Sequence, residues 1–411
     1  MSDHLLDSKK IVIIGGCGHV GLPLGIKFAL AGATTKLLDV DARAVEMVNA
    51  GRMPFLDEGG ETQLGEALTA GMTAVTDPGA CREADVYVFV TGTPVDEHLN
   101  PELSELLGVI DQYHDLFADH SLIVMRSTLY PGTMEFIHKK LRAMNRKTRL
   151  AFCPERVAQG QALKEIESLP QIVAAFDEDS FEAAYELFAE LAPAIVRLTP
   201  LEAELAKLMT NTWRYLEFAI ANEFYMIAET NGIDFHRIYK AIRHEYPRAD
   251  SFKAPGFTGG PCLFKDTMQL ASYYRHRFHL GHTAMLANEG LATFVVEKAA
   301  AALGSSLWGR TAGLLGMAFK ADNDDTRESL SYRVKKGLEF GGARVVYHDP
   351  YLEDARPVKA VLDESDVLIL CVPHREYRAL KIEKPVVDVW GILHEPDLEI
   401  RPGRSKRPKG S

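Results

Sequence analysis

Short apolar runs rich in β-branched residues recur along the first two hundred residues of the chain. The first run, Lys10–Ile14, ends directly in glycines, which predicts a buried parallel strand that leads into a helix. Further runs of the same kind lie at 35–39, 86–90, 122–125 and 172–175. Between the runs, segments such as 22–31 and 42–50 space their apolar residues as helices do. This alternation of strands and helices predicts a doubly wound α/β sheet.

The pattern changes after Leu201. Residues 202–230 contain neither proline nor glycine and keep apolar residues at helical spacing, which predicts one long helix. More helices follow to about residue 302, and strand-like runs then return at 311–316, 343–349, 367–370 and 385–388. We therefore expect two Rossmann-like doubly wound domains joined by a long central helix and a helical middle domain. The expected segments are 1–198, 199–302, 303–403 and a basic tail at 404–411.

Length and charge narrow the classes of protein that the chain can represent. A chain of 411 residues exceeds what one hydrophobic core usually supports, which agrees with several domains. The formal net charge of −11 opposes non-specific attraction to nucleic acid, so no nucleic-acid partner is expected. We interpret the basic run 401–409 as a solvated chain end, with a partner or membrane-surface contact as the weaker alternative.

The sequence predicts neither a membrane protein nor a disulfide scaffold. No apolar window approaches the length that crosses a bilayer, and residues 1–4 lack the pattern of a secretion signal. We therefore expect a soluble, cytoplasmic protein without a membrane span. The five cysteines are odd in number and form no Cys-x-x-Cys pair, which argues against a disulfide framework and a zinc site. Free thiols and no bound metal are expected.

The range Gly16–Gly21 contains a G-x-G-x-x-G motif where the first predicted strand ends and a helix begins. In such a motif the first glycine makes a tight turn, the second lets the backbone approach a pyrophosphate, and the third packs the helix on the strand. The free amides at the helix N-terminus then face the phosphates. The motif therefore predicts a dinucleotide-binding site.

Asp39 stands eighteen residues past Gly21, at the end of the second predicted strand. An acidic residue at this place holds the ribose hydroxyls, which favours NAD over NADP. Asp39 could instead cap the following helix, and Arg43 in that helix could meet a phosphate or solvent. Hydroxyl-bearing loops follow two further strands, at 91–94 and 127–128. Their side chains could contact a ligand at the carboxyl edge of the sheet or cap a turn.

Cys262 follows the glycine-containing stretch 256–260 and precedes Asp266 by four residues. A thiol with a flexible approach path and a nearby carboxylate that can hold water is suited to act as a covalent nucleophile. The alternative is a small buried cysteine near a turn. Because the chain also carries a dinucleotide motif, a hydride acceptor and a thiol together could take an alcohol through an aldehyde to an acid.

Lys207 and Asn211 lie four residues apart on the predicted long helix and therefore share a face. A cation and an amide that project together can stabilise oxygen charge as it develops. A solvated helix face would also explain these two residues. Positive charge near the thiol would lower its pKa and attract an anionic substrate. The basic residues around the thiol segment are Arg248, Lys253 and Lys265.

Taken in order, these motifs resemble those of the UDP-glucose/GDP-mannose dehydrogenase family of nucleotide-sugar 6-dehydrogenases, from the first strand to about Leu393. Three further stretches carry the resemblance: Cys153–Glu155, Glu204–Asn211 and Gly316–Ser329. The resemblance implies a four-electron oxidation that uses two NAD molecules in turn, for polysaccharide precursor synthesis. In the family scheme, a thiolate equivalent to Cys262 adds to the C6 aldehyde, the thiohemiacetal yields a second hydride, and water releases the uronate from the thioester.

The resemblance also implies roles for single residues. The catalytic set is Cys262, Lys207, Asn211, Asp266, Glu155 and Thr128. The residues expected to bind NAD are Gly16, Gly18, His19, Val20, Gly21, Asp39, Arg43, Thr93, Thr128, Lys265 and Arg327. The residues expected to bind the nucleotide sugar are Glu155, Arg156, Val157, Lys207, Asn211, Arg248, Lys253, Gly259, Phe319 and Lys320.

Within the catalytic set, Lys207 and Asn211 would stabilise an oxyanion or, with Asp266, hold a water molecule. Glu155 would act as a general acid or base, or activate water. A homodimer formed through the long central helix is the expected assembly, with Arg248 reaching the substrate of the partner.

The stretch that begins at Glu155 separates the branches of the family. Glu155-Arg156-Val157 resembles the branch that acts on UDP-N-acetylhexosamines such as UDP-N-acetylmannosamine. Where the UDP-glucose branch carries an arginine-rich sequence, this chain has Asp388–Gly391. The expected substrate is therefore a UDP-N-acetylhexosamine, with UDP-glucose as the alternative. A two-electron hydroxyacid dehydrogenase and a non-catalytic nucleotide-binding partner are the remaining interpretations.

Overall fold

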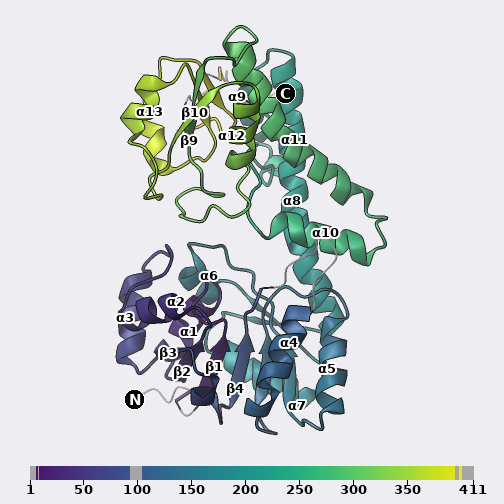
Figure 1. Ribbon diagram of the computed structural model, residues 1–411. Coiled ribbons are helices and arrows are strands. Elements are labelled where there is room, and N and C mark those ends of the chain that lie inside the picture. The colour runs from purple at the N-terminus through teal and green to yellow at the C-terminus, as the bar shows by residue number, and fades with distance from the viewer. Residues whose placement is uncertain (1–5, 8, 93–103, 394–397, 400–411) are drawn as a thin grey trace, which may run out of the picture. The chain divides into compact units, whose positions relative to one another are not determined.

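A computed structural model describes residues 6–7, 9–92, 104–393 and 398–399 (Figure 1). Two sequence predictions, the cofactor contact of Thr93 and the basic tail at 404–411, lie outside the described residues. The chain forms two compact units. The first unit comprises Met1–Arg214, Pro261–His282 and Asn323–Asp325. The second comprises Tyr215–Gly260, Thr283–Asp322 and Thr326–Ser411.

The first unit is built on a sheet in the order β3-β2-β1-β4-β5-β6-β7-β8. Its strands are β1 (Lys10–Ile14), β2 (Thr34–Leu38), β3 (Thr73–Val75), β4 (Val86–Phe89), β5 (Leu122–Met125), β6 (Arg149–Phe152), β7 (Gln171–Ala175) and β8 (Ile195–Leu198). Each strand predicted from an apolar run in this region is present. The order of the strands reverses at β1, which pairs in parallel with β2 on one side and with β4 on the other, as in a doubly wound sheet.

One strand differs in direction from the sequence expectation. The run at 172–175 was expected to be parallel like the others, but β7 pairs antiparallel with β6, and parallel with β8. The connection between β6 and β7 contains a single seven-residue helix, α6 (Ala162–Ser168), which is about 10 Å long. The chain therefore re-enters the sheet from the carboxyl edge of β6.

Helices cover both faces of this sheet. They are α1 (Gly21–Leu30), α2 (Ala42–Asn49), α3 (Gly60–Thr69), α4 (Ser104–Tyr113), α5 (Thr133–Ala143), α6 and α7 (Glu178–Ala189). Ile11 and Ile13 of β1 pack in a core with α1, α3 and α7, whereas Val12 and Ile14 pack in a second core with α4 and α5. Because every strand residue of β1 after the first is buried on one face or the other, the strand reads as a continuous apolar run.

The predicted long helix is present as α8 (Pro200–Thr230), a single element of 31 residues. The boundary between the two units falls within it. It is followed by α9 (Phe235–Arg243), α10 (Leu263–Tyr273) and α11 (His279–Ala302), so the helical region ends where the sequence predicts. Across the described residues, none of the helices combines the length and the apolar character that a membrane span requires.

The second unit contains a four-stranded parallel sheet in the order β10-β9-β11-β12. Its strands are β9 (Thr311–Leu315), β10 (Arg344–His348), β11 (Val367–Leu370) and β12 (Val386–Asp388), with the helices α12 (Ser331–Phe340) and α13 (Val358–Glu364). Leu314 of β9 packs with Val334 and Leu338 of α12, while Leu315 packs with Val361 of α13. Short 3₁₀ turns occur at Pro78–Cys81, His114–Leu116, Pro247–Ala249 and Arg375–Ala379. The predicted class, two Rossmann-like α/β sheets and a long central helix, is confirmed.

Candidate active site

The glycine motif forms the turn between β1 and α1 in the first unit. The left-handed residue of the turn is Gly15, with φ of 81°, so the tight-turn role expected of Gly16 falls one residue earlier. A Cβ on Gly16 would lie 2.7 Å from Leu37 of β2, and a Cβ on Gly21 would lie 2.7 Å from the carbonyl oxygen of Gly15. A Cβ on Gly18 would meet its nearest atom at 3.8 Å. Gly16 and Gly21 therefore serve packing, and the space at Gly18 lets a ligand approach the backbone.

Asp39 lies beside this turn, at the end of β2. Its Oδ2 atom accepts a hydrogen bond from the amide of Cys17 at 2.9 Å, and its Oδ1 atom accepts one from the amide of Asp41 at 3.0 Å. Asp41, not Asp39, caps α2, since its side chain accepts from the amides of Arg43 and Ala44. The helix-capping alternative for Asp39 is therefore wrong. Arg43 itself is exposed.

The N-terminus of α1 has the geometry that a dinucleotide phosphate requires. No side chain caps the first turn, which starts after Val20, and the first amides of a helix have no intrahelical acceptor. The uncapped helix, the open space at Gly18 and the half-buried carboxylate of Asp39 together fit the pyrophosphate and ribose of NAD.

His19 joins the glycine motif to a motif from the far end of the sequence. Its ring lies 4.0 Å from the ring of Phe55 and 3.9 Å from the carboxylate of Asp325, measured from Nε2. Asp325 is buried and accepts a hydrogen bond of 2.9 Å from Gln159. Sequence reasoning assigned no role to Asp325 or Gln159, although Asp325 lies in the stretch Gly316–Ser329 that carried the family resemblance.

Cys262 differs from the other cysteines in its exposure to solvent. Of the five cysteines, all of which lie among the described residues, only Cys262 is exposed. Burial raises the pKa of Cys17, Cys153 and Cys371 to about 12, which keeps these thiols protonated. Cys262 directly precedes α10 as its N-cap residue, where the helix dipole favours a thiolate. The alternative of a small buried cysteine near a turn is therefore wrong.

Asp266, one turn into α10, is the centre of a polar cluster behind the thiol. It is fully buried, and its Oδ2 atom accepts a hydrogen bond of 2.6 Å from Asn211 and a longer one of 3.5 Å from Thr128. The ammonium group of Lys265 lies 3.3 Å from its Oδ1 atom. The structure thus brings together residues from three separate sequence stretches, as their expected roles require.

Lys207 faces the same cluster from α8. Lys207 and Asn211 are both buried, so the alternative of a solvated helix face is wrong. Burial lowers the pKa of Lys207 below its ordinary value, and the negative charges of Asp266, Cys262 and Glu155 offset that effect in part. An ammonium group in this environment is partly desolvated, which strengthens its attraction to a developing oxyanion and eases the loss of its proton.

Glu155 is held as a carboxylate. Its Oε1 atom accepts hydrogen bonds from the amides of Arg156 at 2.7 Å and Val157 at 2.9 Å, and its Oε2 atom pairs with Arg126. Burial alone would raise the pKa of Glu155, but the charge of Arg126 and the two amides hold the pKa below its ordinary value. Because the group is ionised at neutral pH, the geometry favours a proton acceptor or a fixed charge over a general acid.

Arg126 is a further residue near this site that sequence reasoning missed. It follows β5 directly, is 1% exposed, and donates to the carbonyl oxygen of Cys153 at 3.1 Å and to Gln171 at 3.0 Å. Its guanidinium group lies 5.1 Å from the ring centre of Phe188. The available signal was its position between a buried strand and the Ser127-Thr128 loop, at the carboxyl edge of the sheet.

The second unit holds half of the residues expected to bind the sugar nucleotide. Gly260 has φ of 93° and donates its amide to the carbonyl oxygen of Glu328 at 3.1 Å. A Cβ on Gly260 would lie 2.6 Å from the ring of Phe319, and a Cβ on Gly259 would lie 2.9 Å from Glu328. The glycine pair is therefore packed against the segment that carries Phe319 and Lys320, although the two segments are distant in sequence.

The remaining predicted residues are divided between the units. Arg248, Lys253 and Arg327 are exposed residues of the second unit. Three basic residues were expected around the thiol: Lys265 lies in the same unit as Cys262, whereas Arg248 and Lys253 lie in the other unit. Across the part of the chain that the structure describes, no group of three or more His, Cys, Asp or Glu side chains is arranged to hold a metal ion.

Comparisons with known proteins agree with this geometry. Three domain models of the UDP-glucose/GDP-mannose dehydrogenase family match the chain: the NAD binding domain over residues 9–192, the central domain over 201–289 and the UDP binding domain over 313–395. The UDP-N-acetyl-D-mannosamine dehydrogenase of Methanocaldococcus jannaschii is 31% identical over 381 residues, which cover 90% of this chain and 87% of that protein. The chain belongs to the UDP-glucose/GDP-mannose dehydrogenase family. It is an NAD-dependent nucleotide-sugar dehydrogenase.

Other members of this dehydrogenase family show the same relationship. The UDP-N-acetyl-D-mannosamine dehydrogenase of Pyrococcus horikoshii is 28% identical over 94% of this chain and 97% of its own. The solved structure of the P. horikoshii enzyme superposes with a TM-score of 0.88 at 25% identity, covering 94% of this chain and 96% of that chain. A UDP-glucose dehydrogenase structure from Pyrobaculum islandicum gives 0.86 at 27% identity, with 93% and 94% covered.

Proposed function

We propose that this dehydrogenase oxidises the C6 hydroxyl of a nucleotide sugar to the carboxylate in two hydride-transfer steps at one site, with Cys262 as the covalent nucleophile. The observation that carries the proposal is the exposed Cys262 at the N-terminus of α10, beside the buried Asp266 and Asn211. The glycine turn and Asp39 would hold NAD, which would supply the hydride acceptor for each of the two oxidations.

The residues around the thiol account for the proton and charge balance. The Cys262 thiolate adds to the C6 aldehyde, a C–S bond forms, and the carbonyl electron pair moves to oxygen, where Lys207 and Asn211 stabilise it. Loss of the second hydride gives a thioester. Water then attacks the thioester carbon and loses one proton, the C–S bond breaks, and Cys262 regains its thiolate. The uronic acid that forms loses the second proton to solvent and leaves as the uronate. Asp266 and Thr128 hold this water, and Glu155, ionised by its surroundings, attracts the proton that the water loses.

The proposed substrate is a UDP-N-acetylhexosamine of the mannosamine type, and its uronate product serves polysaccharide precursor synthesis. Support comes from the relatives, which are named UDP-N-acetyl-D-mannosamine dehydrogenases, and from the Glu155-Arg156-Val157 stretch. In the second unit Gly259, Phe319 and Lys320 are proposed to bind the nucleotide part. UDP-glucose is the second candidate, because the P. islandicum UDP-glucose dehydrogenase shares the fold closely.

The enzyme is proposed to act as a homodimer. Ile220, Phe224 and Ile227 follow one another at helical spacing along one face of α8 and are 46%, 47% and 59% exposed. An exposed apolar stripe of this kind on a long helix is suited to pack against the same face of a second copy. Arg248 is an exposed residue of the second unit and is proposed to reach the partner's substrate.

The test is a panel of UDP- and GDP-sugars offered with NAD to the wild-type enzyme and to two cysteine variants. We expect UDP-N-acetylmannosamine to be the best substrate, Cys262→Ala to lose net uronate formation, and the matched control Cys81→Ala, at a buried cysteine remote in sequence, to retain activity. Full activity of Cys262→Ala would favour a two-electron hydroxyacid dehydrogenase. NAD binding without NADH formation on any sugar would instead indicate a non-catalytic nucleotide-binding protein.

A further inference from the structure

The two sheets share one hydrogen bond, in which a backbone amide after the first strand donates to an aspartate at the end of the next strand. In the first sheet, the chain leaves β1 through glycine, and the amide of Cys17 donates to Asp39 at the end of β2, at 2.9 Å. In the second sheet, the chain leaves β9 through Gly316, which has φ of 95°, and the amide of Met317 donates to Asp349 at the end of β10, at 2.7 Å. The carboxylate at this position is the group that a dinucleotide ribose contacts in a Rossmann fold.

The two carboxylates differ in what surrounds them. Asp39 is half-buried, whereas Asp349 is 1% exposed. The Oδ2 atom of Asp349 accepts from the amides of Met317 and Ala318 and lies 3.2 Å from Nε2 of His374, while Oδ1 accepts from the amide of Tyr351. Burial alone would raise the pKa of Asp349, but donation from His374 and the two amides holds it below its ordinary value. Asp349 is buried and is bound by four donors of its own chain, so it is not open to a ribose as Asp39 is.

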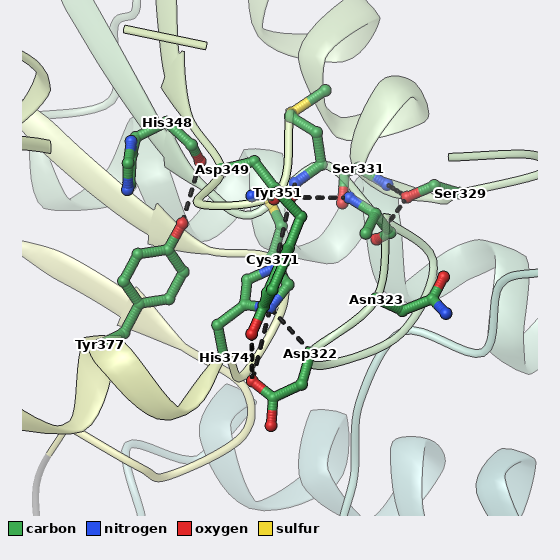
Figure 2. A network of polar contacts seen from close by, with 12 residues as sticks. Asp322, Asn323, Ser329, Ser331, His348, Asp349, Tyr351, Cys371, His374 and Tyr377 are labelled. Carbon is green, nitrogen blue, oxygen red and sulfur yellow. Dashed lines mark hydrogen bonds and ion pairs between the residues drawn. The ribbon is translucent and has the colours of Figure 1, made fainter. Parts of the chain in front are cut away.

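His374 connects Asp349 to the other end of the same segment. The imidazole is completely buried, and the backbone amide of Asp322 donates to its Nδ1 atom at 2.9 Å. Since an amide can only donate, Nδ1 must be unprotonated, and the ring hydrogen is on Nε2, which donates to Asp349. Figure 2 shows Asp322, Asp349 and Tyr351 gathered around this ring. The Tyr351 ring centre lies 5.1 Å from that of His374.

The segment Met317–Asp322 is thus fixed at both ends through one side chain. Asp322 has φ of 53°, a conformation that costs energy for a residue other than glycine. Its carboxylate accepts from the backbone amide of Arg375 at 3.1 Å and from the Arg375 side chain at 2.6 Å. Between the two fixed ends lie Phe319 and Lys320, the residues proposed to meet the nucleotide sugar.

We infer that His374 is a positioning residue that sets the Phe319–Lys320 segment for the nucleotide part of the substrate. The inference rests on the proposed function for the identity of that ligand. Lys320 carries a long side chain, so its charge reaches the same place each time only if the backbone on both sides is fixed. His374 provides this by accepting from one end of the segment and donating to the carboxylate that holds the other.

The test compares three variants of the full-length enzyme. His374→Leu removes both hydrogen bonds, His374→Gln keeps one donor and one acceptor, and His348→Gln is a matched control. His348 is a nearby imidazole whose side chain meets the carbonyl oxygen of Arg356 and Glu376 instead. Binding of UDP alone and NAD alone is measured by calorimetry, and steady-state kinetics are measured with the best nucleotide sugar.

For His374→Leu we expect UDP affinity to fall about tenfold to a hundredfold and KM for the sugar nucleotide to rise in step, with kcat and NAD affinity changed less than about threefold. His374→Gln should recover most of the loss, and the control should match the wild type. Equal losses for UDP and NAD, or no loss of UDP affinity in a folded His374→Leu protein, would overturn the inference.

Hydrogen exchange separates this inference from the proposed function. In His374→Leu the amides of Met317, Ala318 and Asp322 should exchange at least about tenfold faster than in the wild type, because each loses a fixed acceptor or the support of one. Unchanged exchange would overturn the positioning role even in an active enzyme. A wild-type protein that oxidises no nucleotide sugar would sink the proposed function, whereas faster exchange in the variant would still support the fixed segment.

Discussion

Replacing Arg126 by methionine tests the electrostatics beneath the proposed active site. The substitution keeps an unbranched apolar side chain at this position. It removes the charge that pairs with Glu155, the donors to Cys153 and Gln171, and the guanidinium group over the Phe188 ring. Glu155 would then keep its two amide donors while remaining buried without its ion partner. Removing one member of a buried ion pair typically costs about 3–5 kcal/mol, so we expect a loss of that size in the free energy of unfolding.

The loss of stability in Arg126→Met should depend on pH, and the sign of that dependence follows from the pKa of Glu155. In the wild type the folded-state pKa of Glu155 lies below its ordinary value, so the carboxylate adds stability above that ordinary value and loses the contribution as pH falls through the folded pKa. Without Arg126 the folded pKa rises, and a buried charge opposes folding at neutral pH. The penalty of Arg126→Met should therefore be largest at pH 7 to 8 and shrink as the solution is acidified and Glu155 takes up a proton.

The assay is unfolding in urea, monitored by hydrogen exchange of peptides from β5 and β6. This exchange reports the urea concentration at which that part of the sheet is half unfolded. Adding Glu155→Gln to Arg126→Met removes the unpaired charge and should restore about 1–3 kcal/mol of the loss. The matched control is Arg149→Met, because Arg149 is a more exposed arginine of β6 whose nearest ion partner, Asp179, lies 3.9 Å away; it should cost less than about 1 kcal/mol. Equal losses for the two arginines, or a penalty independent of pH, would refute the reasoning.

Three further outcomes are expected. Asp39→Ala should weaken NAD binding about tenfold to a hundredfold in calorimetry, since a charged acceptor for the ribose hydroxyls is lost, and unchanged NAD affinity would contradict the assignment. Asn211→Leu should lower kcat about a hundredfold to a thousandfold with NAD affinity retained, because it removes one oxyanion donor; equal kcat would exclude that role. Ile227→Glu should convert the proposed dimer to monomers in sedimentation equilibrium, and a wild type that is already monomeric would exclude the α8 interface.

Most central strands of the two sheets could be predicted because both of their faces are covered, which makes them continuous apolar runs. The exception is β6, a central strand of only four residues that begins with an arginine, which sequence reasoning missed. The strands that sequence reasoning missed include β3 and β8, which form the two edges of the first sheet. Edge strands are partly exposed, and the two central residues of β8 are solvent-facing, so no apolar run marks them. The antiparallel direction of β7 could not be predicted either, since the apolar content of a strand carries no information on its direction.

The candidate site followed the same division. Cys262, Asp266, Lys207 and Asn211 were predicted because motif spacing places them on the N-terminal turn of α10 and on one face of α8. Arg126 could not be predicted in this way, because a lone charged residue in sequence is most often a solvated side chain. His374 and Asp349 were missed for the same reason, since the role inferred for them depends on a buried network between segments that are distant in sequence.

The most direct measurement of the central claim is the number of NADH molecules formed per molecule of nucleotide sugar when the sugar is limiting and NAD is in excess. A thiol that retains the aldehyde as a covalent adduct carries every substrate through both oxidations. The account predicts two NADH per sugar, with the uronate as the sole released product. One NADH per sugar, with free aldehyde or ketone in solution, would contradict it.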